Sequence, residues 1–360
     1  MILAISIIGV LILFTLLVVA HELGHFMAAR REGVVVDEFG VGFPPRVFGR
    51  KRGDTIYSIN ALPIGGFVRL RGEDGSIKGK GSFASLNFWP KTRVIMAGVV
   101  VNFLIAYAIF TFLLIIGIPP LGQPLPSFGP IKPTQDPAGN LIVMTVAPNS
   151  AASTAGIKQG DSIVAIDDQQ LKTNESMREF TRSHAGQTVV IKINQGGRTQ
   201  QKTIVLGTNE SAGILGITAD QMSLSRYSWW AAPIAALVMM FQFVVATLAA
   251  FGNLIVGLFS RGKVSDQVSG PIGAVSIFSQ IMNFGYRYIL LFVASISLSL
   301  AVINALPLPA LDGGRQFILI LQKFGIRITP ERENLVHILG FVALIALMII
   351  ISISDIARLR

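Results

Sequence analysis

The sequence predicts a polytopic α-helical membrane protein of about four transmembrane helices, with a membrane-associated β-hairpin and one inserted α+β domain. Of the 360 residues, 51% are hydrophobic and only 14% are charged, and the mean hydropathy is +0.61. An ordinary soluble domain is less apolar than this. Apolar stretches of about membrane thickness alternate with polar stretches, which predicts several crossings of a bilayer.

The charge and the cysteine content exclude other classes of protein. The net charge is +10, but lysine and arginine form no compact run interleaved with aromatic residues, so we expect no nucleic-acid partner. The positive charge lies mostly beside apolar stretches, which indicates the surface of a lipid bilayer. The chain has no cysteine, which excludes disulfide bonds and thiol chemistry.

Residues 1–31 are predicted to form the first transmembrane helix, which ends in the motif HELGH. No basic residue precedes its apolar core, so we expect a retained helix and not a cleaved signal peptide. His21 and His25 fall one turn apart on one helix face and can bind the same zinc ion, with Glu22 beside them. A histidine pair on an apolar helix can also be purely structural, so the context of the motif must decide.

Residues 32–92 are predicted to form a cytoplasmic loop. Between positions 26 and 93 there are 12 lysine or arginine residues against 6 acidic ones, which by the positive-inside rule places the N-terminus outside and HELGH near the cytoplasmic face. Residues 55–59 alternate like a strand, and the sequence PIGG at 63–66 turns the chain toward residues 67–70. We expect a β-hairpin that dips toward the bilayer, the alternative being a surface connector.

Residues 93–118 are predicted to form the second transmembrane helix. Gly98 and Asn102 lie near its cytoplasmic start, at the depth expected for His25. An asparagine amide is costly in hydrocarbon unless it has a hydrogen-bond partner. Asn102 therefore marks either a contact between helices or a site.

A soluble domain follows the second helix. Residues 119–136 are rich in proline and glycine and are predicted to be a linker, and residues 137–210 combine strands with short helices. Between positions 119 and 229 there are 9 basic and 8 acidic residues, a balance compatible with the external side. We expect this domain outside the membrane.

Residues 211–287 are predicted to be a linker followed by an interfacial or re-entrant segment. Its apolar part, 229–259, is long enough to cross a membrane. A crossing here would place the acidic group of Asp312 at the face opposite to His25. If both bind one metal ion, this segment does not cross.

Residues 288–315 are predicted to form the third transmembrane helix, with Pro307 and Pro309 breaking it before Asp312. A catalytic zinc ion takes three protein ligands, and HELGH supplies two. Asp312 is the best third ligand, because no other acidic residue lies between Asp266 and Glu331 and glycines beside it allow a close approach. Its alternative role is a helix cap.

The remaining chain completes the predicted topology. Residues 316–333 are predicted to form a basic cytoplasmic loop, and residues 334–355 the fourth transmembrane helix, which leaves the C-terminus outside. His337 stands alone in that helix. We expect it to be structural and not a metal ligand.

Together these motifs resemble the bacterial site-2 proteases, the PDZ-containing intramembrane zinc metalloproteases. The resemblance rests on HELGH, AGVVVN, SGPIG and NALPLPALDGGR, and on AGIKQGDSIVAID, which is similar to the signature of PDZ domains. It implies that His21, His25 and Asp312 bind one Zn²⁺ per chain and that Glu22 is the general base. It further implies contacts to the substrate by Asn102, Asn304, Pro307, Pro309, Tyr57, Gly65, Gly66 and Phe67.

The chain departs from many relatives of that family in two places. Gly98 is followed by Val99 where many have proline, so the local backbone is expected to differ. There is room for one PDZ-like domain and not for two in tandem, which weakens any size filter built on two. The residues of its peptide groove are not identified.

The predicted function is therefore an intramembrane endopeptidase of the bacterial cytoplasmic membrane. The resemblance implies single-span membrane proteins as substrates, either anti-sigma factors or remnants of signal peptides, in regulated intramembrane proteolysis. The PDZ-like domain would bind peptide C-termini or act as a steric cap. Two alternatives from other classes are a non-proteolytic membrane adaptor that binds peptide termini and a metal transporter.

Overall fold

The computed structural model describes residues 2–75, 77–121, 124–135, 141–171, 173–195, 198–208, 214–221, 223–261, 264 and 268–358. The chain divides into two compact units. The first comprises residues Met1–Ile109, Met240–Ser279 and Phe292–Arg360, and the second comprises Phe110–Met239 and Gln280–Leu291. Each unit is described by itself.

Five long apolar helices account for most of the hydrophobic sequence. They are α1 (Ile2–Arg31), α2 (Phe88–Ile116), α5 (Ala232–Arg261), α7 (Tyr286–Ala305) and α9 (Pro330–Arg358). At about 1.5 Å per residue, 20 or more residues reach across a hydrocarbon core of about 30 Å. In the described part of the chain, five helices are therefore long and apolar enough to cross a membrane, one more than the about four predicted.

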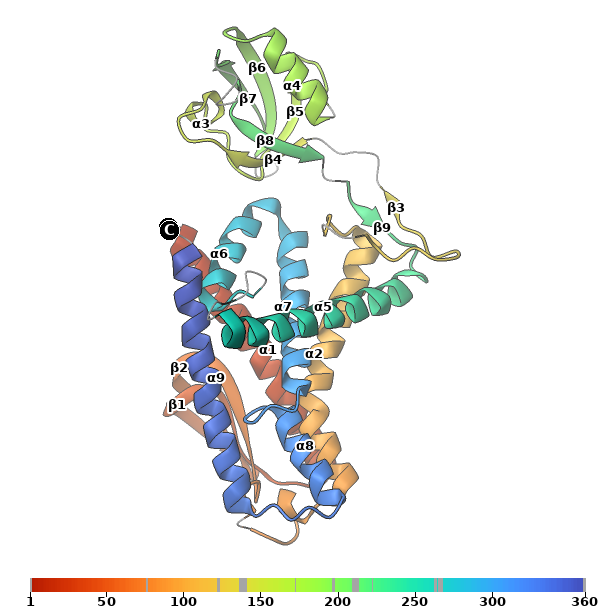
Figure 1. The fold of residues 1–360 in the computed structure, drawn as a ribbon, viewed down its shortest axis with the longest axis vertical. Helices are drawn as coiled ribbons and strands as arrows, with labels where there is room; N and C mark the ends of the chain where they lie inside the picture. The colour runs from red at the N-terminus through yellow and green to blue at the C-terminus, as the bar shows by residue number, and fades with distance from the viewer. Residues whose placement is uncertain are drawn as a thin grey trace. The chain divides into compact units, whose positions relative to one another are not determined.

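The additional helix is α5, which covers the segment predicted to be interfacial. It is continuous over 30 residues, because its one proline, Pro233, lies in the first turn, where proline is tolerated. From Met240 onward, where α5 belongs to the first unit, it lies crosswise to the axes of α1 and α9 in Figure 1 instead of parallel to them. That direction suits a helix lying in the plane of the membrane. The placement of this segment relative to the bilayer stays a prediction.

The predicted hairpin is wider than expected and folds back on itself. β1 (Val36–Arg52) and β2 (Thr55–Leu70) are antiparallel and are joined by a tight turn at residues 53–54, not by the predicted turn at 63–66. Phe39 pairs with both Val68 and Tyr57, so the first half of β1 lies between the two halves of β2. The PIGG sequence is thus a bend inside β2, and residues 66–70 form an edge of the sheet.

A buried carboxylate stabilises this sheet. Glu38 is 4% exposed and accepts a hydrogen bond from Ser58 at 2.7 Å, and its other oxygen lies 2.7 Å from the Arg46 guanidinium. Burial raises the pKa of the Glu38 carboxyl, but the bonds from Ser58 and Arg46 outweigh it and hold that pKa below its ordinary value.

The second unit contains the inserted α+β domain. Its antiparallel sheet has the order β7-β6-β5-β4-β8, and buried aliphatic side chains such as Leu141, Ile163 and Ile191 fill its core. The elements are β4 (Leu141–Val146), α3 (Ala151–Thr154), β5 (Ser162–Ile166), α4 (Asn174–Ser183), β6 (Thr188–Gln195), β7 (Arg198–Val205) and β8 (Ile217–Gln221). The predicted boundaries at 136/137 and 210/211 lie outside the described residues. Strand β8 extends the domain past 210, because it pairs with β4.

Short elements connect these parts. Strand β3 (Thr134–Gln135) pairs with β9 (Ser225–Arg226), so the linkers that enter and leave the domain are joined to each other. The remaining elements are η1 (Phe83–Ser85), α6 (Pro271–Ile281), η3 (Met282–Phe284) and α8 (Asp312–Lys323). The predicted third span, 288–315, thus consists of α7, a bend and the first turn of α8.

Candidate metal centre

Helix α1 presents the two histidines of HELGH on one face, as predicted. His21 and His25 are each 7% exposed, and their rings meet edge to face with centroids 4.7 Å apart. Gly24 allows α2 to approach closely on the same side, since a Cβ there would lie 2.6 Å from the Ala97 carbonyl oxygen. The close contact between helices places the imidazoles against α2.

One face of α2 receives the histidines. Val94, Gly98 and Asn102 follow one another at intervals of four residues, which aligns them on a helix. A Cβ at position 98 would lie 2.4 Å from His25 Nε2 and 2.6 Å from His21 Nε2. Gly98 therefore leaves the space that the two nitrogens occupy.

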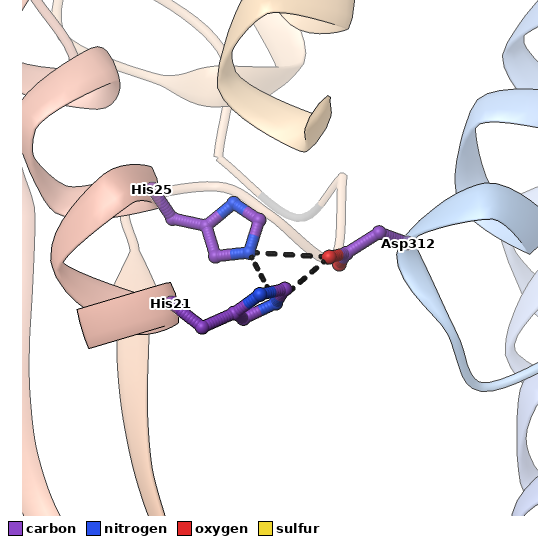
Figure 2. Close-up of side chains that lie close together, drawn as sticks. All are labelled: His21, His25 and Asp312. Carbon is purple, nitrogen blue, oxygen red and sulfur yellow. Dashed lines mark hydrogen bonds and ion pairs between the residues drawn. The ribbon is translucent and has the colours of Figure 1, made fainter. Parts of the chain in front are cut away.

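Asp312 reaches the histidines from the bend between α7 and α8. Helix α7 ends at Ala305, and Ala310 has a φ of +71°, which turns the chain into α8. A Cβ at Gly314 would lie 2.1 Å from the Leu308 carbonyl oxygen, so only glycine permits this packing. As the first residue of α8, Asp312 points toward His21 and His25 (Figure 2).

The three ligand atoms converge on one point. Asp312 Oδ2 lies 3.0 Å from His21 Nε2 and 3.3 Å from His25 Nε2, and the two nitrogens are 3.1 Å apart (Figure 2). Ligands at the usual zinc distances in a tetrahedral site lie roughly 3.3 Å from each other. In the described part of the chain Oδ2 is buried and accepts no hydrogen bond. The three side chains therefore fit a zinc ion.

Outer hydrogen bonds orient both rings. His25 Nδ1 donates to the Val94 carbonyl oxygen at 2.8 Å, which leaves the Nε2 lone pair free for a metal. The side-chain amide of Asn102 lies 3.4 Å from His21 Nδ1, and its oxygen is buried without a hydrogen bond among the described residues. Exchanging the amide nitrogen and oxygen lets Oδ1 accept the Nδ1 proton of His21, which gives both of these atoms a hydrogen-bond partner.

A cavity of about 220 Å³ borders the ligands and contains the other polar groups predicted for the site. Glu22, Asn102 and Asn304 line it together with His21 and Asp312. Val18, Leu300, Ala310 and Leu311 complete its walls. The cavity combines the Glu22 carboxylate and two side-chain amides with two of the three ligand residues, His21 and Asp312. A metal site with a carboxylate beside it is the arrangement that metal-dependent hydrolases use.

The bend of β2 lies against helix α1, which carries HELGH. Thr15 Oγ1 donates to the Pro63 carbonyl oxygen at 3.1 Å and accepts from Gly65 N at 3.3 Å. A Cβ at Gly66 would be 3.8 Å from Glu22 Cγ. The bend of β2 therefore packs on α1 beside Glu22.

Sequence comparison shows what kind of protein carries this site. Residues 9–348 match the peptidase family M50. The chain belongs to peptidase family M50. It is 26% identical to the zinc metalloprotease RasP of Geobacillus kaustophilus, with 98% of each chain covered. It is 30% identical to a Clostridium perfringens chain provisionally named as a zinc metalloprotease, with 97% of this chain and 98% of that chain covered.

As a member of family M50, the chain is a zinc metalloprotease and a bacterial membrane protein. Among solved structures, it is similar to the PDZ domain of the SdrC-like protein from Listeria monocytogenes. That similarity has 26% identity, covers 24% of this chain and 93% of that chain, and has a TM-score of 0.22.

Some predicted M50 site residues lie away from the cavity, and others were missed. Tyr57 packs on Phe26, with ring centroids 6.1 Å apart. The cavity lining does not include Tyr57, Phe67, Pro307 or Pro309. Sequence reasoning did not assign Gly98 to the site, although its spacing of four residues from Asn102 was a usable signal. Leu300, Ala310 and Leu311 carry no such signal.

Proposed function

We propose that this metalloprotease hydrolyses peptide bonds inside the membrane, within transmembrane segments of single-span proteins. His21, His25 and Asp312 hold one zinc ion, and Glu22 is the general base. The observation that carries the proposal is the convergence of three ligand atoms within 3.0–3.3 Å, on and between helices of membrane-spanning length.

Each residue of the cavity has a chemical task. His21, His25 and Asp312 would hold the zinc ion, which when bound would supply the Lewis acidity that activates water and polarises the scissile carbonyl. Glu22, on the cavity wall, accepts a proton from the water and later returns it to the leaving amine. Asn102 and Asn304 line the same cavity and can donate amide protons to the substrate backbone. Asn304 is the next-to-last residue of α7, directly before the bend that leads to Asp312.

The substrate helix must unwind before it is cleaved. Carbonyl groups in a transmembrane helix are engaged in internal hydrogen bonds, and breaking each bond costs several kcal/mol in hydrocarbon. Residues 66–70 offer an edge strand that can restore these bonds by pairing with the substrate. Gly66 lies beside Glu22, and Gly65 lies near Val18 on the same helix. Phe67 belongs to this edge and Tyr57 to the neighbouring half of β2, and Pro307 and Pro309 lie in the bend that leads to Asp312.

The cellular role follows from the same site. We place the protein in the bacterial cytoplasmic membrane, with its termini and the PDZ-like domain outside and the zinc site near the cytoplasmic face. Its substrates are then anti-sigma factors already cut on the external side, or remnants of signal peptides. The PDZ-like domain binds the new peptide C-termini or excludes uncut proteins.

Substitution Glu22→Gln tests this function. It keeps the shape of the side chain and removes the base, so we expect a folded, zinc-loaded protein whose cleavage of a truncated single-span substrate falls by at least about 100-fold. The measurement is accumulation of that substrate in cells, alongside the zinc content of the purified variant. Cleavage at the normal rate would contradict the proposal.

A further inference from the structure

His337 on α9 holds the bend that delivers Asp312. The N–H of Ala310 donates to His337 Nδ1 at 2.9 Å. Because Nδ1 accepts this bond, it carries no proton, and the imidazole proton lies on Nε2. Nε2 is buried and has no hydrogen-bond partner in the described part of the chain. Among the described residues, the His337 ring therefore makes its hydrogen bond with the N–H of Ala310, through Nδ1 as acceptor.

Ala310 needs such support. Its φ of +71° lies in the left-handed region, which is unfavourable for any residue with a Cβ unless its surroundings enforce it. An N–H at membrane depth without an acceptor is also costly. The hydrogen bond to His337 on α9 gives the Ala310 N–H an acceptor. It also stabilises Ala310 in the left-handed conformation that the bend requires.

A second contact from α9 lies one turn further along. A Cβ at Gly340 would be 2.3 Å from Pro309 Cβ and 2.9 Å from the Pro309 carbonyl oxygen, so α9 lies directly on the bend. His337 and Gly340, three residues apart, are on the same face of α9. They contact two successive residues of the bend, Ala310 and Pro309.

The bend and Asp312 are packed together as one unit. Ala310 and Leu311 line the cavity with Asp312, and the N–H groups of Gly314 and Arg315 both donate to the Leu311 carbonyl oxygen. Gly314 packs so closely on Leu308 that no space remains between the bend and the start of α8. A shift at Ala310 is therefore transmitted to the carboxylate of Asp312.

We infer that His337 is a positioning residue for the metal centre, whose Nδ1 fixes Ala310 and thereby sets Asp312 against His21 and His25. This inference rests on the proposed role of Asp312 as a zinc ligand. The resemblance and the sequence identify His337 only as an isolated histidine in an apolar helix.

The test compares three substitutions of His337 in the full chain, purified in detergent. Asparagine places its amide oxygen where Nδ1 lies and keeps the acceptor, leucine fills the space without an acceptor, and glutamine moves the acceptor away. We expect His337→Leu and His337→Gln to weaken zinc binding roughly 10-fold, measured by competition with a chelator, as loss of a supporting group of a metal site does. The leucine and glutamine variants should lower kcat for a single-span substrate and leave KM unchanged. In His337→Asn, zinc binding and kcat should both equal those of the unchanged protein.

The outcomes separate this inference from the proposed function. Zinc binding and kcat equal to the unchanged protein in both the leucine and glutamine variants would overturn the positioning role. A failure of asparagine to restore binding, with the fold intact by circular dichroism, would also overturn it. If leucine prevents folding, glutamine and asparagine still decide. Asp312→Asn is measured in parallel, because only retention of zinc by that variant would contradict Asp312 as a ligand.

Discussion

The two halves of the metal centre are built in different ways. His21 and His25 follow from helix periodicity alone, and one face of α2 supports both rings through Val94, Gly98 and Asn102. Asp312 stands on a bend that requires two prolines, a left-handed Ala310 and glycines without space for a Cβ. A ligand pair on one helix is placed by its spacing and is supported by one face of one neighbouring helix, whereas a ligand from a distant part of the chain needs a bend with several special residues.

The largest loss of zinc affinity is expected from a substitution at Gly98, where the space beside the two histidines is smallest. In Gly98→Ala the methyl group would lie 2.4 Å from His25 Nε2 and 2.6 Å from His21 Nε2, so both ligands must move. We expect zinc affinity to fall by about 100-fold or more, with loss of proteolysis. Gly252→Ala is the matched control, because it adds the same methyl group inside helix α5 with nothing within 4 Å.

The corresponding change in the other half sharpens the comparison. In Gly314→Ala the methyl group meets the Leu308 carbonyl oxygen and displaces only Asp312, so two ligands remain in place. Zinc titration of this variant should show weaker binding than the unchanged chain and stronger binding than Gly98→Ala. The reverse order would show that the bend is the rigid half.

The smallest effect concerns the sheet beside the site and depends on pH. The pKa of Glu38 is lower in the folded protein than the ordinary value of 4.5, so its ionised form stabilises the fold. This stability is fully present above about pH 4.5 and is lost as the pH falls through the lower, folded pKa. Glu38→Gln should therefore reduce the melting temperature near neutral pH and leave it little changed in stronger acid. A melting-temperature difference that grows toward low pH would contradict this sign.

The sequence predicted those features that depend on residues close together in the chain. HELGH identified both histidines and Glu22, the paired prolines marked the end of α7, and Asn102 stood out as an amide in hydrocarbon. The path of β2 was not predicted, because the insertion of β1 between its two halves depends on pairing between distant residues such as Phe39 and Val68. The support of Asp312 by His337 also escaped prediction, since it joins α9 to a bend 27 residues away.

The placement of α5 shows where composition is insufficient. Its length of 27 residues and hydropathy of 2.3 lie within the range of the other candidate spans. What sets it apart is its direction, which is crosswise to the axes of α1 and α9 (Figure 1). Hydropathy measures how apolar a helix is and contains no information on its orientation.

The most direct test of the account is X-ray absorption spectroscopy at the zinc edge on the purified protein, combined with metal analysis. We expect one zinc ion per chain with two imidazole nitrogens, the remaining ligands being oxygens. The chain contains 4 histidines, so a site with three or four imidazoles is chemically available. Finding such a site, or two imidazoles that persist in His21→Ala, would contradict the centre formed by His21, His25 and Asp312.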